Sequence, residues 1–328
     1  MEDRHNNRSL FWPVILIGAG LIWLLYNLDL ISGVNISAVF RLWPLLLIGA
    51  GLDLLFGRRY QVIGALFGLA VVAGLITVTL AGPRLGLVSA NELQTETFVA
   101  PSGLARRAKL EFQFSSGRIQ VQPLSGSPNL VVATAVHSGK VEFQDSGTTN
   151  RAIRLNGPQH IGNPFVWFNN LGEQSWDVAI SPDVPVDLDL GVSSGKAEIQ
   201  LSGLKVESAA ILVSSGDTEV LLPATGKAYP TNLKISSGTL MVTVPAGAET
   251  VIDSQISSGR LTFEVPASSP VRFQVTHKSS GNVRLPERFQ LVRGNERGEG
   301  VWEAPGTDPS APLIEISVGI SSGSVIVR

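Results

Sequence analysis

The hydrophobic residues of this chain follow two patterns, one near the N-terminus and another over the remainder. Two N-terminal segments, Leu10 to Leu28 and Val62 to Ala81, contain no charged residue, and a third, Leu42 to Phe56, contains only Asp53. About 20 apolar residues in a helix cross a hydrocarbon core of about 30 Å. The first pattern therefore predicts an N-terminal α-helical transmembrane domain of three spans, of which Leu42 to Phe56 is the shortest.

The first two predicted spans carry the same motif, WPxxLIGAGL, which begins at Trp12 and again at Trp43. Tryptophan suits the headgroup level of a bilayer, and proline suits the first turn of a helix. The motif's glycines, among them Gly18 and Gly49, allow two helices to approach closely. We interpret them as packing residues of a hairpin, and contact with a partner's helix is the alternative.

Basic residues near the spans predict an orientation, because cytoplasmic loops carry an excess of Lys and Arg. A three-span topology places four arginines on the N-terminal side and two on the other: Arg4, Arg8, Arg58 and Arg59 against Arg41 and Arg84. We therefore expect residues 1–9 to form a cytoplasmic tail, 10–82 the membrane domain and 83–95 a linker, with the following domain outside. No cleavage site of the small-x-small type follows the first span, so it is not read as a signal peptide. Asp53 is expected at the membrane interface, with a functional intramembrane acid as the alternative.

The second pattern begins near residue 96 and consists of short alternating runs separated by Ser-Ser-Gly. The glycine of this triplet occurs at positions 117, 195, 216, 238, 259, 281 and 323. From 195 to 281 it recurs every 21 or 22 residues, and a fixed period of this size indicates stacked structural repeats. Period-two alternation predicts strands with one buried face. The sequence thus predicts that residues 96–328 form an all-β, single-chain β-solenoid with about 21–22 residues per rung.

Each repeat is expected to run strand, turn, strand, with glycine supplying the positive φ of a tight turn. Replacing Gly238 with valine should then be costly, because a β-branched residue resists that conformation. Stacked turns would form a polar ridge along one edge. Hydrogen bonds between serines of successive rungs are the interpretation we favour, and a binding site is the alternative.

Three irregularities interrupt the repeat. An insert at about residues 145–180 contains the aromatic cluster Phe165 to Phe168, which is expected to pack against the solenoid, with a recognition patch as the alternative. The gap from Gly281 to Gly323 equals two periods, which predicts a degenerate repeat near Trp302. The chain finishes within a predicted strand, Ser324 to Arg328, so the last rung is expected to present an open edge for self-association or a partner strand.

Composition removes several function classes. The chain has no cysteine, and 25 Lys and Arg residues against 27 Asp and Glu residues leave no broad basic surface for nucleic acid. The histidines, His5, His137, His160 and His277, have no metal-ligand spacing. Three acids, Asp183, Asp187 and Asp189, are spaced as one outer face of a strand, and we interpret them as a solvated face. We therefore expect no catalytic, cofactor-binding or metal site and no enzymatic activity.

A family resemblance rests on these motifs. The duplicated WPxxLIGAGL segment resembles the transmembrane region of LiaI- and LiaF-like bacterial proteins. The Ser-Ser-Gly repeats, the stretch from Ala105 to Leu124 and the WxVxISPxVP pattern from Trp176 resemble the toast-rack β-domain of many of these proteins and of bacterial adhesins. The resemblance implies right-handed winding and a cell-envelope protein of the type that regulates a membrane sensor kinase responding to wall-active antibiotics. Some relatives have four spans instead of three, which leaves the side of the β domain open.

The favoured hypothesis is a non-enzymatic, membrane-anchored regulator or sensor of envelope stress, multi-pass in a bacterial cell membrane. Its expected partners are the lipid bilayer and a membrane sensor kinase or another envelope protein, with homo-oligomers through the hairpin or the open solenoid edge and no nucleic acid. The alternative is a surface adhesin or polymer-binding β-solenoid. A solenoid hydrolase or lyase is the least favoured hypothesis.

Overall fold

The computed structural model describes residues 11–28, 43–52, 66, 68–74, 76–77, 93–158, 174–295 and 298–328. The chain separates into two compact units, each described here by itself. Met1–Glu92 and His160–Gly172 form the first, called the N-terminal unit, and Leu93–Gln159 and Glu173–Arg328 form the second, called the β unit.

The two copies of the WPxxLIGAGL motif are helical. Helix α1 (Phe11–Asn27) contains the first copy and α3 (Trp43–Leu52) the second, and both tryptophan–proline pairs lie in the first helical turn, as predicted. Residues 68–74 are also helical. Apolar side chains such as Leu16 (70% exposed) and Ile17 (73%) project from α1. Within the described residues, no helix combines the length and apolarity that crossing a membrane requires. The three spans stay a prediction, and Asp53 lies outside the described residues.

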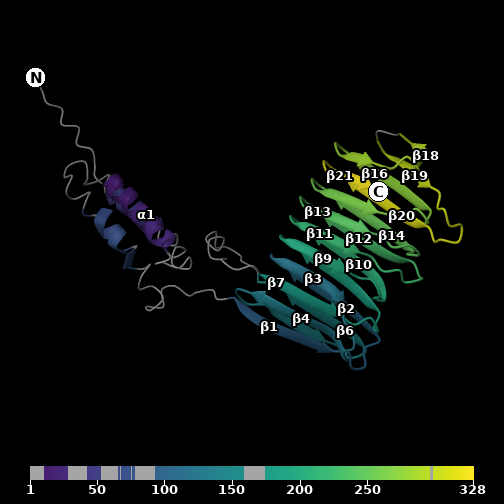
Figure 1. Cartoon of the computed structure of the whole chain (residues 1–328), viewed down its shortest axis with the longest axis horizontal. Helices are drawn as coiled ribbons and strands as arrows, with labels where there is room; N and C mark the ends of the chain where they lie inside the picture. The colour runs from purple at the N-terminus through teal and green to yellow at the C-terminus, as the bar shows by residue number, and fades with distance from the viewer. Residues whose placement is uncertain are drawn as a thin grey trace, which may run out of the picture. The chain divides into compact units, whose positions relative to one another are not determined.

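The β unit contains two mixed sheets (Figure 1). The ten-stranded sheet has, side by side, β1 (Gln94–Pro101), β4 (Asn129–His137), β7 (Ser175–Ile180), β3 (Arg118–Pro123), β9 (Lys196–Gln200), β11 (Asp217–Leu221), β13 (Thr239–Thr243), β15 (Arg260–Glu264), β21 (Ser324–Val327) and β17 (Asn282–Arg284). The eleven-stranded sheet has β18 (Gln290–Gly294), β19 (Gly300–Ala304), β16 (Val271–Lys278), β20 (Ile314–Ile320), β14 (Thr250–Ile256), β12 (Tyr229–Ile235), β10 (Val206–Val213), β8 (Val186–Val192), β2 (Arg107–Phe114), β6 (Asn150–Asn156) and β5 (Glu142–Ser146).

In the middle of the β unit the chain passes from one sheet to the other at every strand. Strands β8, β10, β12 and β14 are parallel neighbours in one sheet, and β9, β11, β13 and β15 are parallel neighbours in the other. Each Ser-Ser-Gly triplet between β8 and β15 connects a strand of the first set to the next strand of the second. The stacked arrangement predicted from the 21- to 22-residue period is therefore present over this part of the chain.

The core lies between the two sheets, because alternate residues of each strand point inward. Strand β12 illustrates the pattern, with Thr231, Leu233 and Ile235 buried and the residues between them exposed. The largest side chains that are less than 2% exposed, Trp176 and Tyr229 among them, belong to this core. The period-two alternation in the sequence thus marks the buried face correctly.

The two ends of the β unit do not continue the stacked repeat. The prediction of a uniform β-solenoid over residues 96–328 is therefore wrong at both ends. Strands β1, β4 and β7 pair antiparallel at one end, as do β5 and β6. At the other end β19 pairs antiparallel with β16 and β18. Of these pairs, β5–β6 and β18–β19 are local hairpins, in which a short turn returns the chain antiparallel to the preceding strand. Strands β1, β4 and β7 pair antiparallel across long stretches of sequence instead.

The C-terminal strand is an interior strand, which corrects the prediction of an open edge at Ser324 to Arg328. Strand β21 lies between β15 and β17, and β20 lies between β14 and β16. The residues from Gly281 to Gly323 contain the hairpin of β18 and β19, with Trp302 on β19, in place of a degenerate repeat. Strand β20 buries Ile314, Ile316, Val318 and Ile320 on one face, and an interior position provides strands on both sides of this apolar row.

The stretch that the sequence marks as an insert contributes to both sheets. Strand β6 pairs with β2 in the eleven-stranded sheet, and β7 pairs with β3 and β4 in the ten-stranded sheet. The aromatic cluster Phe165 to Phe168 lies outside the described residues.

Candidate functional site

The Ser-Ser-Gly turns stack into a continuous ladder, called here the serine ridge. The backbone N–H of Ser215 donates to the carbonyl of Ser193 (2.9 Å), and Ser237 donates to Ser214 in the same way (2.8 Å). The pattern continues through the triplets that end at Gly259, Gly323 and Gly281, in that spatial order. The predicted ridge is therefore present, although its last two turns are reversed relative to the sequence because β20 and β21 lie inside the sheets.

Hydroxyl groups of the ridge add hydrogen bonds between neighbouring turns. Ser215 Oγ donates to the Ser193 carbonyl (3.0 Å), Ser194 Oγ to Ser115 (3.1 Å), and Ser322 Oγ to Ser257 (3.0 Å). These serines serve the stacking of turns, which supports the structural interpretation of the ridge over a binding site. The repeated bonding also differs from a single serine activated by a base.

The glycines of the ridge are required for two different reasons, and the prediction of a positive φ at Gly238 is wrong. Gly117 and Gly195 adopt φ values of 104° and 103°, whereas Gly238 is not among the glycines with positive φ. A Cβ placed on Gly238 would lie 2.5 Å from the carbonyl oxygen of Gly216 and 2.8 Å from Val213 Cγ1. Close stacking of one turn on the next, and not turn conformation, excludes a side chain there.

The outer face of the eleven-stranded sheet carries a network of ion pairs around β2 and β8. Arg107 donates from Nε and Nη2 to the carboxylate of Asp187 (2.8 and 3.0 Å) and pairs with Glu207 (2.9 Å). The hydrogen bond from Arg107 lowers the pKa of Asp187, and Ser208 Oγ adds a second donor at 2.6 Å. The Asp187 carboxylate is thus satisfied by neighbours on adjacent strands.

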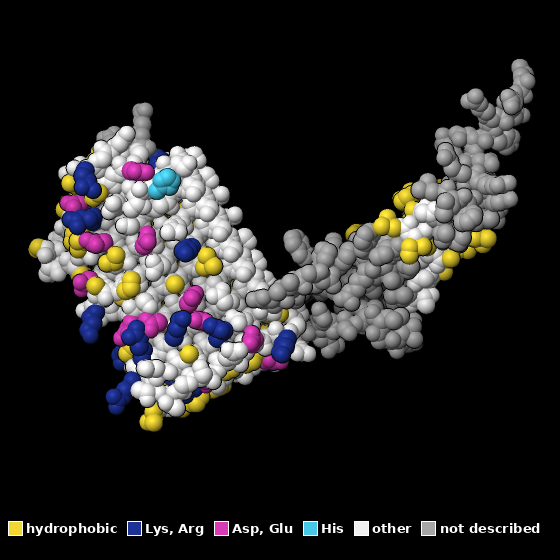
Figure 2. Space-filling view, turned by 180° about the vertical axis from the view of Figure 1, so that it is seen from behind, with side chains coloured by type: hydrophobic (Ala, Val, Ile, Leu, Met, Phe, Trp, Pro, Cys, Tyr) yellow, Lys and Arg dark blue, Asp and Glu magenta, His cyan; other side chains and the backbone are white. Residues whose placement is uncertain are grey.

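A second carboxylate on this face is also fully engaged. Glu111 accepts from Lys109 Nζ (2.6 Å) and Arg154 Nε (2.7 Å), and these bonds lower its pKa. Figure 2 shows acidic and basic side chains interspersed over one face of the β unit, not gathered into patches of one sign. Asp187 and Asp189 lie on the outer face of β8, as predicted, whereas the same prediction is wrong for Asp183, which lies before β8 begins.

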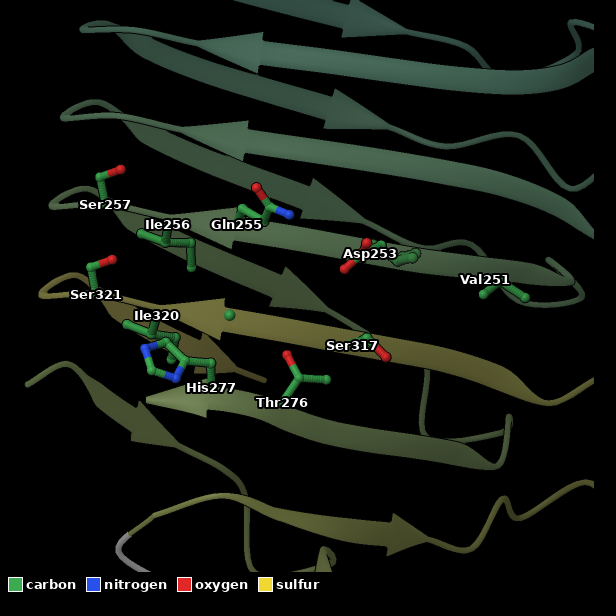
Figure 3. A pocket seen from close by; sticks show the side chains of 12 residues that line it. Val251, Asp253, Gln255, Ile256, Ser257, Thr276, His277, Ser317, Ile320 and Ser321 are labelled. Atoms are coloured by element: carbon green, nitrogen blue, oxygen red, sulfur yellow. The ribbon is translucent and has the colours of Figure 1, made fainter. Parts of the chain in front are cut away.

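A furrow interrupts the same outer face further along, over β20. Gly319 pairs with Gln255 on β14 and His277 on β16, and Ser317 pairs with Asp253 on β14. Small residues in the middle strand between longer ones on both sides leave a cavity of about 690 Å³. Figure 3 shows Gln255 and Asp253 on one strand and His277 on another, on either side of β20. We call this cavity the β20 furrow.

Sequence reasoning missed the β20 furrow. It places no functional residue at Gln255, Ser317 or Gly319, because β14 and β20 are far apart in the chain and their pairing leaves no trace in the repeat period. The only signal is the composition of β20, where Gly319 occupies an outward position within an otherwise regular strand.

The histidines do not assemble into a site. His137 is 1% exposed, stacks on Trp176 with ring centroids 6.1 Å apart, and lies 3.7 Å from Glu96. His277 lines the β20 furrow and lies 3.5 Å from Glu299. His5 and His160 fall outside the described residues. In the described parts of the chain, no group of three or more His, Cys, Asp or Glu could hold a metal ion.

The N-terminal unit contains one close helix contact at a motif glycine. A Cβ on Gly18 would overlap the side chain of Val72, which lies in the helical residues 68–74. By contrast, no heavy atom of the described residues comes within 4 Å of a Cβ built on Gly20 or Gly51. Gly18 is therefore a packing residue within the chain, and its contact is with the third predicted span.

Comparisons with known proteins agree with these features. The model of the LiaI-LiaF-like transmembrane region matches residues 10–55, and that of the N-terminal domain of toast_rack matches residues 89–252. No curated protein matches. Among solved structures, a proposed cell adhesion protein from Clostridium sporogenes is 17% identical with a TM-score of 0.47, covering 72% of this chain and 99% of its own. A proposed adhesin from Bacteroides fragilis is 10% identical with a TM-score of 0.34, covering 72% and 97%.

The toast_rack match extends over 164 of the 328 residues, from residue 89 to residue 252. It includes most of the parallel strands that form the middle of the two sheets. The LiaI-LiaF-like match includes both copies of the WPxxLIGAGL motif and indicates membrane anchoring. This chain therefore belongs to the toast-rack family and carries a LiaI-LiaF-like transmembrane region before its β domain.

Proposed function

We propose that this protein is a membrane-anchored, non-enzymatic regulator or sensor of cell-envelope stress, similar in role to LiaF-like proteins. The observation that carries the proposal is the combination, within one chain, of a LiaI-LiaF-like transmembrane region at residues 10–55 and a toast-rack domain beginning at residue 89. Such a chain joins a membrane anchor to a rigid surface of two sheets. This arrangement suits a protein that senses or contacts other envelope components.

The membrane segment would contact a sensor kinase or another envelope protein through its helices. Gly18 already packs against Val72, whereas Gly20 and Gly51 have open space around them among the described residues. A small residue with open space allows close approach of a second helix. Gly20 and Gly51 are therefore the positions at which a partner's helix would lie, and the same surface would serve self-association.

The β unit would be extracytoplasmic. Four arginines on the N-terminal side of a three-span topology, against two on the other side, support a cytoplasmic N-terminus. The non-enzymatic role is supported by the serines of the ridge, whose hydroxyls donate to carbonyls of neighbouring turns and do not pair with a histidine or carboxylate in the described residues.

The proposal is tested by deletion and complementation in the bacterium that encodes the protein. We expect deletion to change the transcriptional response to a wall-active antibiotic, measured with a reporter, and the full chain to restore it. The Gly20→Leu variant should fail to restore the response, because leucine fills the space left for a partner's helix. Ala19, exposed on the same helix, provides the matched control Ala19→Leu. An unchanged response after deletion would refute the regulatory role.

A further inference from the structure

We propose that the β20 furrow binds a neutral, hydroxyl-rich glycan chain. The proposal deepens the function above, because it names the class of molecule that the β unit would sense, and it rests on that function only for the source of the glycan. Binding itself follows from Gly319, from the polar groups of the walls and from the absence of Lys and Arg among the residues that line the furrow.

Gly319 is a glycine that the fold does not require. Its φ is outside the left-handed region, and a Cβ built there would meet only Thr276 Oγ1 at 3.8 Å and the Ser254 carbonyl at 3.9 Å, which are ordinary contacts. Glycine within a strand is less favourable than alanine, because it loses more conformational freedom on folding. Strand glycines often mark a bulge or the close approach of a ligand, and Gly319 lies opposite a bulge of β16 between Val275 and His277. That bulge leaves room for a side chain at Gly319, so it does not by itself require the glycine. Gly319 keeps the furrow open at this cost.

The walls of the furrow carry polar side chains without partners. Asp253, Gln255 and Ser317 make no side-chain hydrogen bond or ion pair within the described part of the chain, although all three face the furrow. Elsewhere on the same sheet face, Asp187 and Glu111 are held by basic neighbours. A carboxylate and an amide on β14 and a hydroxyl on β20 complement sugar hydroxyls, each of which donates and accepts.

The furrow also offers apolar surface. Val251, 48% exposed, lies at one end, and the imidazole ring of His277 lies at the other. Such surfaces suit the C–H faces of sugar rings, since binding sites combine apolar contact with a few oriented polar groups. The volume of about 690 Å³ falls within the range of roughly 300–1,000 Å³ typical of ligand pockets.

The charges at the furrow favour a neutral ligand over an anionic one. No Lys or Arg is among the residues that line it, and Asp253 contributes a carboxylate. Nearby, Arg272 pairs with Glu303 (3.0 Å) and Glu315 (3.3 Å), and Glu299 faces His277. A phosphate or carboxylate would meet no Lys or Arg among the residues that line the furrow, so the lining favours a neutral polymer. Lys234, which pairs with Gln255 from β12, lies just beyond the lining.

Glycan binding is measured by saturation-transfer NMR on the full chain in detergent, with three neutral probes: chitotetraose, cellotetraose and maltotetraose. Tetragalacturonate is the anionic probe. We expect at least one neutral probe to bind and its signal to fall at least tenfold in Gly319→Leu, because leucine fills the furrow. Gln255→Ala is the second variant, should Gly319→Leu fail to fold, and is expected to weaken binding in the same direction.

Gln120→Leu is the matched control, because it adds the same side chain to an exposed position on β3, in the ten-stranded sheet, whereas the furrow lies on the eleven-stranded sheet. It should bind as the wild type does. Absence of binding by all three neutral probes, equal binding by Gly319→Leu, or stronger binding of tetragalacturonate would each overturn the proposal. A reporter response that deletion leaves unchanged, together with intact glycan binding, would refute the regulatory function alone, so the two failures are distinguishable.

Discussion

Glycine has three different roles in the β unit, and they differ in what a side chain would cost. Gly195 needs both its positive φ and the space beside the Gly117 turn, Gly238 needs only the space beside the Gly216 turn, and Gly319 needs neither. In the sequence, Gly195 and Gly238 both end a Ser-Ser-Gly triplet and cannot be told apart. Only the structure separates conformation from close stacking, because the separation depends on how far one turn lies from the next.

This difference predicts opposite effects of the same substitution. Gly238→Ala should destabilise the protein by about 1–3 kcal/mol, since the added methyl overlaps the Gly216 backbone. Gly319→Ala should stabilise the protein by about 0.5–1 kcal/mol, because alanine loses less conformational freedom on folding than glycine does and its methyl group meets no clash at this position. Thermal unfolding of the full chain in detergent, followed by circular dichroism, measures both. Equal melting temperatures for Gly238→Ala and wild type would contradict the stacking argument.

Asp187 predicts a pH dependence of stability. Its pKa in the folded protein lies below the ordinary value of 3.8, because Arg107 donates two hydrogen bonds to it. A carboxyl with a lowered pKa stabilises the fold above its unfolded pKa, and this contribution is lost as pH falls through the folded value. At pH 7, the Asp187→Asn variant should therefore unfold at a lower midpoint concentration of urea than the wild type. The difference should shrink from about pH 5 downward and disappear once the pH lies below the pKa of Asp187 in the folded protein. If the stability difference between Asp187→Asn and wild type were the same at pH 7 and at low pH, it would arise from packing and not from the charge of Asp187.

At the scale of elements, the sequence predicts strands better than it predicts their pairing. Alternating residues such as Leu233 and Ile235 on β12 identify a strand and its buried face. The constant period also predicts that β8 to β15 stack in order. The positions of β20 and β21 could not be predicted, because their alternation suits any interior position and the period carries no information about which neighbours they join.

Hydrogen exchange tests the interior position of β20. Ile314–Ile320 bonds to parallel strands on both sides, whereas Gln290–Gly294 of β18 is an edge strand whose residues are all exposed. We expect the amides of β20 to exchange as slowly as those of β14 (Thr250–Ile256), and those of β18 to exchange much faster. Exchange of β20 as fast as β18 would place the C-terminal strands at an edge.

The position of β20 between β14 and β16 also explains why the β20 furrow could not be predicted from the sequence. The β20 furrow depends on Gly319 lying between Gln255 and His277, and no spacing in the sequence brings these three residues together. The network at Asp187 was easier to anticipate as a charged outer face, since Asp187 and Asp189 alternate with buried leucines. Patterns within one strand are visible in sequence, whereas sites formed across strands require the topology.

At the scale of the whole molecule, the two units place their apolar residues differently. The N-terminal unit exposes Leu16, Ile17 and Trp23 on α1, as a lipid-facing helix does, and the β unit buries its apolar residues between two sheets. Regulation and glycan binding both require that the β unit lie on the outer side of the membrane to which the N-terminal unit is anchored.

The most direct test of this arrangement uses the absence of cysteine in the chain. Lys227→Cys places one thiol on an exposed turn of the β unit. A membrane-impermeant maleimide should label this variant in intact cells to the same extent as in lysed cells, and the cysteine-free chain should remain unlabelled. Labelling only after lysis would place the β unit in the cytoplasm and contradict the account of an envelope sensor.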